Sequence, residues 1–193
     1  MQDTQEFKPK GKLRDSLVRI NKEDERSIYN TGSYDYSLKS IGRGHIKNYR
    51  EEAVKNALLL SGANAYYEYM QYYINGKNSY FPDFITDIYF KGRQVILEPH
   101  GDFNKHYISK MKEFSKLYHN FYLVFIMSNN NYKHLDNYTI NEIKRFSKIW
   151  IIKDFNDKKE NLQESTMQIL EKINELRMRD LDYKAYLRVK KDS

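Results

Sequence analysis

Residues 65 to 98 leave this chain few choices of local structure. The segment is dominated by Tyr, Ile, Phe and Val, and two turn dipeptides divide it, Asn75-Gly76 and Lys91-Gly92. Aromatic and β-branched residues favour strands, and short dipeptides that end in Gly favour hairpin turns. The last part, QVILE, is almost continuously apolar, which is typical of a strand buried on both faces. The segment therefore predicts a three-stranded antiparallel meander, with strands at about 65–74, 79–90 and 93–98.

Helical periodicity flanks this β-rich segment on both sides. The stretch NYREEAVKNALLLSG (48–62) places Val54, Ala57 and Leu58 at helical spacing, and Gly62 is a natural stop. After the meander the pattern predicts, in order, a helix at 106–118, a strand at 121–127, a polar loop at 128–138, a helix at 139–149, a strand at 150–155 and an amphipathic helix at 160–180. The order αβββαβαβα predicts an α/β fold, with a mixed central β-sheet flanked by helices on both faces.

The chain has 193 residues, which is enough for one domain with a substantial core and short for two. Residues 1–46 mix charges with few apolar anchors and predict a polar, basic N-terminal arm. We expect a short helix in this arm at about Leu13 to Ile20, and the folded domain at 47–193.

Net charge and cysteine content restrict the function classes. The chain carries 33 basic and 26 acidic residues, a net charge of +7, and it has no cysteine. The absence of cysteine excludes disulfides and thiolate metal sites. A basic chain favours a polyanionic partner, nucleic acid first and an acidic membrane surface second, although a plain solvated surface has the same composition. No apolar run approaches the roughly 20 residues that cross a bilayer, and the first residues lack the apolar core of a signal peptide. We therefore expect no membrane segment and an intracellular, cytoplasmic protein.

Asp83, Glu98 and His100 stand at the ends of two neighbouring predicted strands. A hairpin that turns at Lys91-Gly92 pairs Asp83 with about residue 100, and the two-residue strand period puts Glu98 and His100 on the same face. Two carboxylates in one small patch repel unless a cation lies between them, and hard oxygen ligands suit Mg²⁺ or Mn²⁺. Taken singly, either acid is also explained as a turn Asp after Pro or as a solvated Glu at a strand end.

These residues resemble the signature of the PD-(D/E)XK nuclease superfamily. FPDF supplies the Pro-Asp, LEPH supplies an acidic residue followed by Pro99, and the resemblance covers about residues 45 to 127. It implies a restriction-endonuclease-like core and a divalent-metal-dependent endonuclease that hydrolyses DNA phosphodiester bonds. It also implies that Asp83, Glu98 and the main-chain carbonyl of Pro99 hold the metal. The layout is similar to Holliday-junction-resolvase-like members, which suggests branched DNA. The composition also resembles that of small nucleases of archaeal viruses, and for a viral protein the location would be the host cytoplasm.

The sequence departs from this signature where the family has its lysine, because His100 occupies that position. His100 would serve as a general base, or the positive charge would come from Lys105 or Lys110 on the next helix. The alternatives are that His100 is a structural residue, and that the chain is a catalytically inactive DNA-binding module on the same fold. An RNA-directed nuclease also stays open.

The family often carries a further Glu on its first helix, and Glu51 and Glu52 both qualify. Glu51 lies three and seven positions before Val54 and Leu58, on the buried side of the helix, so it is the better candidate. Acidic residues in the first turn of a helix are also favoured by its dipole alone.

Basic residues that would bind DNA phosphates flank the proposed site. They are Arg43, Lys47 and Arg50 before or at the start of the first helix, and Lys105 and Lys110 after the meander. GRGH (42–45) lacks the spacing of a phosphate-binding loop, so we expect no nucleotide cofactor. The apolar stripe of the last helix either closes the core or pairs with a second copy, which predicts a homodimer.

Overall fold

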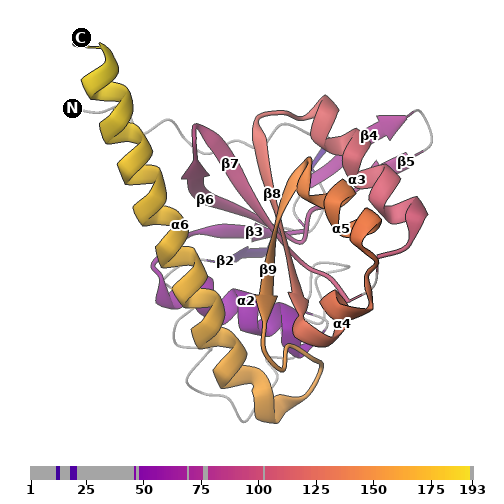
Figure 1. Cartoon of the computed structure of the whole chain (residues 1–193). Coiled ribbons are helices and arrows are strands. Elements are labelled where there is room, and N and C mark those ends of the chain that lie inside the picture. The colour runs from indigo at the N-terminus through magenta and orange to yellow at the C-terminus, as the bar shows by residue number, and fades with distance from the viewer. Residues whose placement is uncertain are drawn as a thin grey trace.

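A central six-stranded sheet organises the computed structural model of the protein (Figure 1). The structure describes residues 12–13, 18–20, 46, 48–68, 70–75, 78–101 and 103–191. The strands of the sheet, in spatial order, are β2 (Val18–Ile20), β3 (Ala65–Tyr67), β6 (Phe84–Phe90), β7 (Arg93–Pro99), β8 (Phe121–Ser128) and β9 (Ser147–Ile152). β7, β8 and β9 run parallel to one another, and the other neighbours are antiparallel. The predicted α/β class with a mixed sheet is confirmed.

A smaller three-stranded sheet lies beside the central one. Its order is β1 (Lys12–Leu13), β4 (Met70–Asn75) and β5 (Asn78–Tyr80), all antiparallel. The short helix expected at Leu13 to Ile20 is wrong, because the described parts of that range, 13 and 18–20, are strand residues paired with β4 and β3. Cross-strand pairing with distant residues outweighs the weak local helix propensity there.

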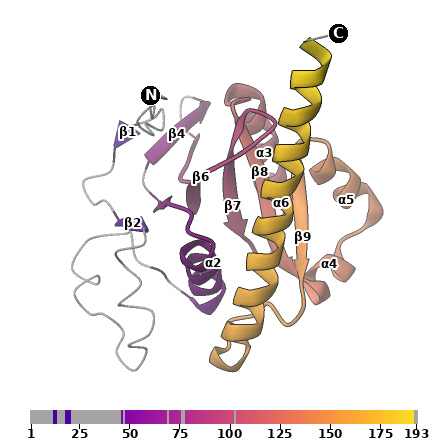
Figure 2. The ribbon, with the colours of Figure 1, turned by 90° about the vertical axis from the view of Figure 1, so that its left-hand side faces the viewer.

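Helices cover both faces of the central sheet (Figures 1 and 2). They are α2 (Tyr49–Leu60), α3 (Lys105–Leu117), α4 (Asn129–His134), α5 (Asn137–Lys144) and α6 (Leu162–Lys191), with a 3₁₀ turn, η3 (Lys159–Asn161), before α6. α2 packs against α6 on one face, while α3 and α5 lie on the other. Each face has its own apolar cluster, so the fold has three layers.

Side-chain alternation along β7 assigns its residues to the two faces. Val95 and Leu97 belong to the cluster under α2 and α6, and Ile96 belongs to the cluster under α3. The strand period of two therefore directs Glu98 to the α3 face, the same face as Ile96.

Two of the predicted strands are each broken into two. The run 65–74 divides into β3 and β4 around Glu68, which has a positive φ of 42°, and the run 79–90 divides into β5 and β6 at residues 81–83. In each run one half belongs to the central sheet and the other to the small sheet. Propensity identifies β residues but does not say which partner strand each residue will find.

The hairpin register differs from the prediction near the site. Tyr89 pairs with Gln94 as expected for a turn at Lys91-Gly92, but Phe84 pairs with Leu97, because the register shifts between Ile85 and Tyr89. Extra residues on β6 make an irregularity of the β-bulge kind. Asp83 therefore comes next to Glu98, not opposite residue 100.

The boundaries of the elements after β8 also differ from the prediction. The predicted loop 128–138 contains α4, the predicted helix 139–149 is α5 at Asn137–Lys144, and the strand expected at 150–155 is β9 at Ser147–Ile152. Asp136 starts α5 early by accepting a hydrogen bond from the Thr139 N–H at 2.8 Å. Parallel pairing with β8 sets the start of β9.

α6 runs well past the expected end at 180. Its last turns project beyond the end of the sheet (Figures 1 and 2). Among the described residues, no helix combines the length and the apolar composition that a bilayer-spanning segment needs.

Candidate functional site

Glu98 lies at the C-terminal end of β7 with 3% of its surface exposed. Its Oε1 atom accepts hydrogen bonds from the Tyr80 hydroxyl and, at 2.9 Å, from the main-chain N–H of Asp83. Its Oε2 atom accepts a hydrogen bond from the Tyr107 hydroxyl at 3.3 Å. The carboxylate is therefore held in one orientation by three donors, which come from the end of β5, the loop before β6 and helix α3.

Burial decides the charge state of this carboxylate. Removal from water raises the pKa of Glu98 to about 7, while the hydrogen bonds from Tyr80, Asp83 and Tyr107 and the nearby charge of Lys110 oppose the rise. Burial next to Glu98 also raises the pKa values of the Tyr80 and Tyr107 hydroxyls well above the usual range, so both stay protonated as donors. Glu98 is thus poised to gain or lose a proton near neutral pH.

Asp83 lies between residues on the two faces of the central sheet. It is half-buried in the loop before β6, its N–H donates to Glu98, and its carbonyl accepts from the N–H of Glu68 at 3.0 Å. Its negative charge contributes to the raised pKa values of Tyr67 on one side and of Tyr80 and Tyr107 on the other. Asp83 and Glu98 are therefore neighbours, through a different register, and the contact between them joins the Asp83 main chain to the Glu98 carboxylate. The predicted meeting of the two carboxylates stays a prediction.

Glu51 faces inward, as we predicted when we preferred it to Glu52, which is half-buried. It is 6% exposed in the first turn of α2, where Asn48 forms the N-cap. The Asn48 side chain accepts from the Glu51 N–H at 3.0 Å and donates to Glu51 Oε1 at 3.0 Å, and the Tyr67 hydroxyl donates to Glu51 Oε2 at 2.6 Å. Tyr67 belongs to the cluster under α2 and α6. Glu51 thus approaches the site from the face opposite Glu98, and Tyr67 and Asp83 lie between them.

His100 follows β7 and shares the face of Glu98, as the strand period predicts. Its N–H donates to the Ile126 carbonyl at 2.9 Å, which continues the pairing of β7 with β8. Its ring stacks on Tyr107 at 3.9 Å between centroids and 6° between planes, and meets Phe103 edge-on at 4.9 Å. The ring is half-buried, and Tyr107 connects it with Glu98.

Two of the predicted cations come to this site. The Lys110 ammonium lies over the rings of Tyr80 and Tyr107, at 5.7 Å and 5.4 Å from their centroids, and its charge reaches Glu98. Lys105 is exposed at the start of α3. Arg43 and Lys47 lie outside the described residues.

Arg50 is the second cation, and Gly101 makes room for it. A Cβ atom at position 101 would collide with Nη1 of Arg50 and would lie 3.2 Å from its Cζ. The Nε atom of Arg50 is buried and has no hydrogen-bond partner among the described residues. Asn131 on α4 donates to the Gly101 carbonyl from the far side. The guanidinium therefore lies beside the residue that follows His100, and its planar set of donors suits phosphate oxygens.

The donors suit a hard divalent cation in type. Asp83 and Glu98 offer carboxylate oxygens, and the carbonyl of Pro99, the last residue of β7, is a further oxygen. In the part of the chain that the structure describes, no group of three or more His, Asp or Glu side chains is arranged closely enough to hold a metal ion. A cation placed at Glu98 would offset the cost of burying its charge, which is the physical reason that these residues fit one.

Tyr80, Tyr107, Glu68 and Gly101 belong to the site and were missed in the sequence. The helical spacing of Tyr107, Ile108, Met111 and Phe114 places Tyr107 with the apolar residues of its helix, but nothing local shows that its hydroxyl reaches Glu98. Glu68 is 8% exposed at the break between β3 and β4. Only Gly101 carried a usable signal, a glycine directly after the proposed site residue His100.

We compared the chain with family models, curated proteins and solved structures, and none of them matches it.

Proposed function

We propose that this protein is a divalent-metal-dependent endonuclease that hydrolyses DNA phosphodiester bonds on a restriction-endonuclease-like core. The observation that carries the proposal is the contact between Asp83 and Glu98 at the carboxyl end of β7, with the charge of Lys110 near Glu98 and Arg50 beside Gly101. In open α/β sheets, ligands bind outside the carboxyl ends of the strands. An acidic pair flanked by cations is suited to a metal ion together with a phosphate group.

Asp83, Glu98 and the Pro99 carbonyl would hold Mg²⁺ or Mn²⁺. When bound, such an ion polarises the phosphate and lowers the pKa of a coordinated water.

The chain's own residues have separate roles in this proposal. Arg50 binds phosphate oxygens beside Gly101, and this contact does not depend on the base sequence. Lys110 favours the charged form of Glu98, because its positive charge lowers the pKa of that carboxyl. His100, held by Tyr107, accepts the proton of the attacking water in place of the family's lysine. Glu51 acts as a positioning residue that holds Tyr67 between α2 and Asp83.

One observation favours a DNA-binding module that does not cut. Oε1 of Glu98 already accepts two hydrogen bonds, and Oε2 accepts a third. A carboxylate held by three donors has little remaining capacity for a metal. In that case Arg50 and the other basic residues bind DNA, and Glu98 has a structural role.

Cleavage of labelled linear duplex, single-stranded and four-way-junction DNA, with Mg²⁺, Mn²⁺ or EDTA, tests the proposal. An RNA strand of the same sequence tests the choice of nucleic acid. We expect metal-dependent cutting by the wild type and a loss of at least ~100-fold in Asp83→Asn. His100→Ala then reports whether the ring takes part in proton transfer.

The matched control is Glu160→Gln, which removes an exposed carboxylate far along the chain, in η3. It should cut like the wild type. Binding of these DNAs without cleavage in either metal would replace the nuclease by the binding module. Thermal unfolding gives a readout that does not depend on activity: Mg²⁺ or Mn²⁺ should raise the melting temperature of the wild type and not that of Asp83→Asn.

A further inference from the structure

Helix α6 has a second stripe on the side away from the core. Its buried stripe includes Ile169, Ile173 and Leu176, which pack in the cluster shared with α2. At 100° per residue, the outer side of the helix carries Met167, Asn174, Met178, Leu181 and Ala185, with Leu170 at its margin, where it also packs against the core cluster. These positions follow one another at spacings of three and four residues, the pattern of a helix that packs against another helix.

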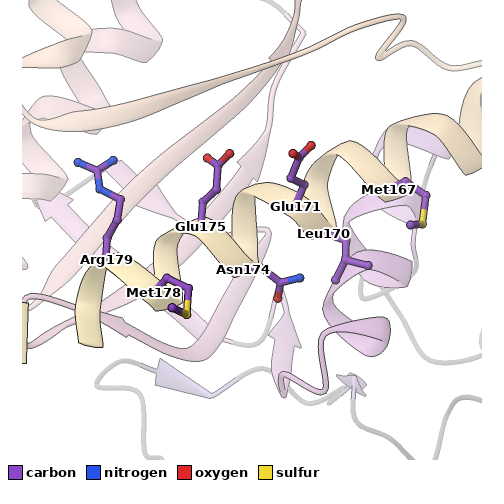
Figure 3. Close-up of a pocket in the computed structure, with 7 residues that line it drawn as sticks. All are labelled: Met167, Leu170, Glu171, Asn174, Glu175, Met178 and Arg179. Carbon is purple, nitrogen blue, oxygen red and sulfur yellow. The ribbon is translucent and has the colours of Figure 1, made fainter. Parts of the chain in front are cut away.

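The outer stripe is apolar and open to solvent. Met167 is 53% exposed, Met178 is 60% exposed and Leu181 is 58% exposed, while Leu170 is half-buried at its margin. Figure 3 shows Met167, Leu170, Asn174 and Met178 along one side of the helix, and Glu171, Glu175 and Arg179 pointing to the other side. All seven residues line a shallow hollow. Exposed apolar side chains gathered on one helix face mark an interaction surface.

The two edges of this stripe carry charged residues of opposite sign. On the helical wheel, one edge carries Glu164, Glu171, Glu175 and Asp182, and the other carries Arg177, Lys184 and Arg188. Glu171 and Asp182 make no ion pair among the described residues. The acidic edge spans residues 164–182 and the basic edge spans residues 177–188, so the two edges have opposite sign where they overlap. On the basic edge, Arg177 donates to the Ser61 carbonyl at 2.6 Å, and Lys184 forms an ion pair with Asp180 at 2.6 Å.

We propose that the outer stripe of α6 binds a second copy of this chain, with the two α6 helices parallel and related by a two-fold axis. In a parallel pair, the acidic edge of each helix meets the basic edge of its partner. In an antiparallel pair, acidic edges would meet each other and so would basic edges, which costs energy. Where the two edges overlap, the charge pattern therefore favours a second copy in the parallel direction, and Asn174 in the stripe is a polar residue that can fix the register.

The parallel pair leaves the Glu98 sites free. Because the outer stripe lies opposite the stripe that contacts the core, the two sheets would stand on the outer sides of the helix pair. This inference does not rest on the proposed function, because it uses only α6.

The chain has no cysteine, so single introduced cysteines report the geometry cleanly. Each stripe residue of a parallel, in-register pair meets its own copy, and we expect both Asn174→Cys and Leu181→Cys to form intermolecular disulfides under mild oxidation. A disulfide needs Cα atoms within about 7 Å, whereas seven residues span about 10 Å of helix. An antiparallel pair would therefore cross-link at one of these positions at most. Arg179→Cys, which projects away from the stripe, is the control and should stay unlinked.

Sedimentation of the full chain over a range of concentrations tests the association itself. We expect twice the chain mass for the wild type and an increase of at least ~10-fold in the dimer Kd for Leu181→Asp. The matched control, Tyr186→Asp, changes a similarly exposed residue, 60% against 58%, that lies off the stripe. A wild-type chain that stays monomeric at all concentrations overturns the proposal, as does cross-linking at only one of the two stripe positions.

Discussion

Burial and hydrogen bonding act in opposite directions on the pKa of Glu98. Burial favours the neutral acid, while Tyr80, Tyr107 and the Asp83 N–H favour the carboxylate, and the balance puts its pKa at about 7 in place of the ordinary 4.5. A group that titrates near neutral pH in a site of this kind is a candidate for function. It also makes the stability of the fold depend on pH.

We predict that the free energy of unfolding falls as the pH rises from 5 to about 7.5, in EDTA. Across this window the folded protein binds a proton at Glu98 that the unfolded chain has already lost, so a higher pH favours the unfolded state. The effect is on the order of 3 kcal/mol. Urea unfolding at several pH values measures it, and Glu98→Gln should remove most of the slope.

Other groups of the chain also contribute to the dependence of stability on pH, so the difference between the slopes of wild type and variant is the informative quantity. Glu160→Gln should keep the wild-type profile. Equal slopes for wild type and Glu98→Gln would mean that Glu98 is ionised throughout.

Arg50 depends on the absence of a side chain at position 101. We predict that Gly101→Ala lowers DNA affinity by roughly 3- to 10-fold, because the new methyl displaces the guanidinium from the end of β7. The displaced atoms belong to the far end of a flexible side chain, so the free energy of unfolding should change by less than about 1 kcal/mol. Fluorescence anisotropy with a labelled duplex, together with urea unfolding, measures both effects.

A double-mutant cycle separates this effect from a general loss of affinity. Arg50→Gln should weaken binding by a similar factor and reduce the salt dependence by about one counterion, and the double variant should lose little more. Additive losses would show that Gly101 and Arg50 act independently.

At the scale of elements, the irregularity in β6 decides which residues meet. Thr86 is fully buried there, and its hydroxyl donates to the Val95 carbonyl at 2.8 Å and accepts from the Ile88 N–H at 3.2 Å. The Gln94 side chain in turn donates to the Thr86 carbonyl at 3.0 Å. These contacts hold the register that brings Asp83 to Glu98.

We predict that Thr86→Val, which keeps the shape of the side chain, lowers the free energy of unfolding by about 1–3 kcal/mol. It leaves the Val95 carbonyl and the Ile88 N–H without their partner in a buried place. Urea unfolding measures the loss. Thr139→Val, which breaks a contact with Asp136 at the exposed start of α5, is the matched control and should cost less. A Thr86→Val protein as stable as the wild type would show that the hydroxyl does not hold the register.

At the scale of the whole molecule, three layers meet at the end of the central sheet. Glu51 and Tyr67 come from the α2 layer, Glu98 and Tyr107 from the α3 side, and Asp83 lies between them. The long helix α6 lies on the same face of the sheet as α2 (Figure 2), and its outer stripe faces away from the core. The candidate site and the proposed dimer surface are thus built on different elements and can be tested separately.

The sequence by itself determined the α/β class, the succession of helical and β-rich segments after residue 48 apart from α4, the inward side of Glu51 and the shared face of Glu98 and His100. These depend on local periodicity, which is written in consecutive residues. Only the tertiary structure decided the division of the β-rich segment between two sheets, the register of β6 on β7, the approach of Tyr80, Tyr107 and Lys110 to Glu98, and the position of Arg50 beside Gly101. Those outcomes depend on contacts between residues far apart in the chain, where the strands' choice of partners and the packing of the layers outweigh local propensity.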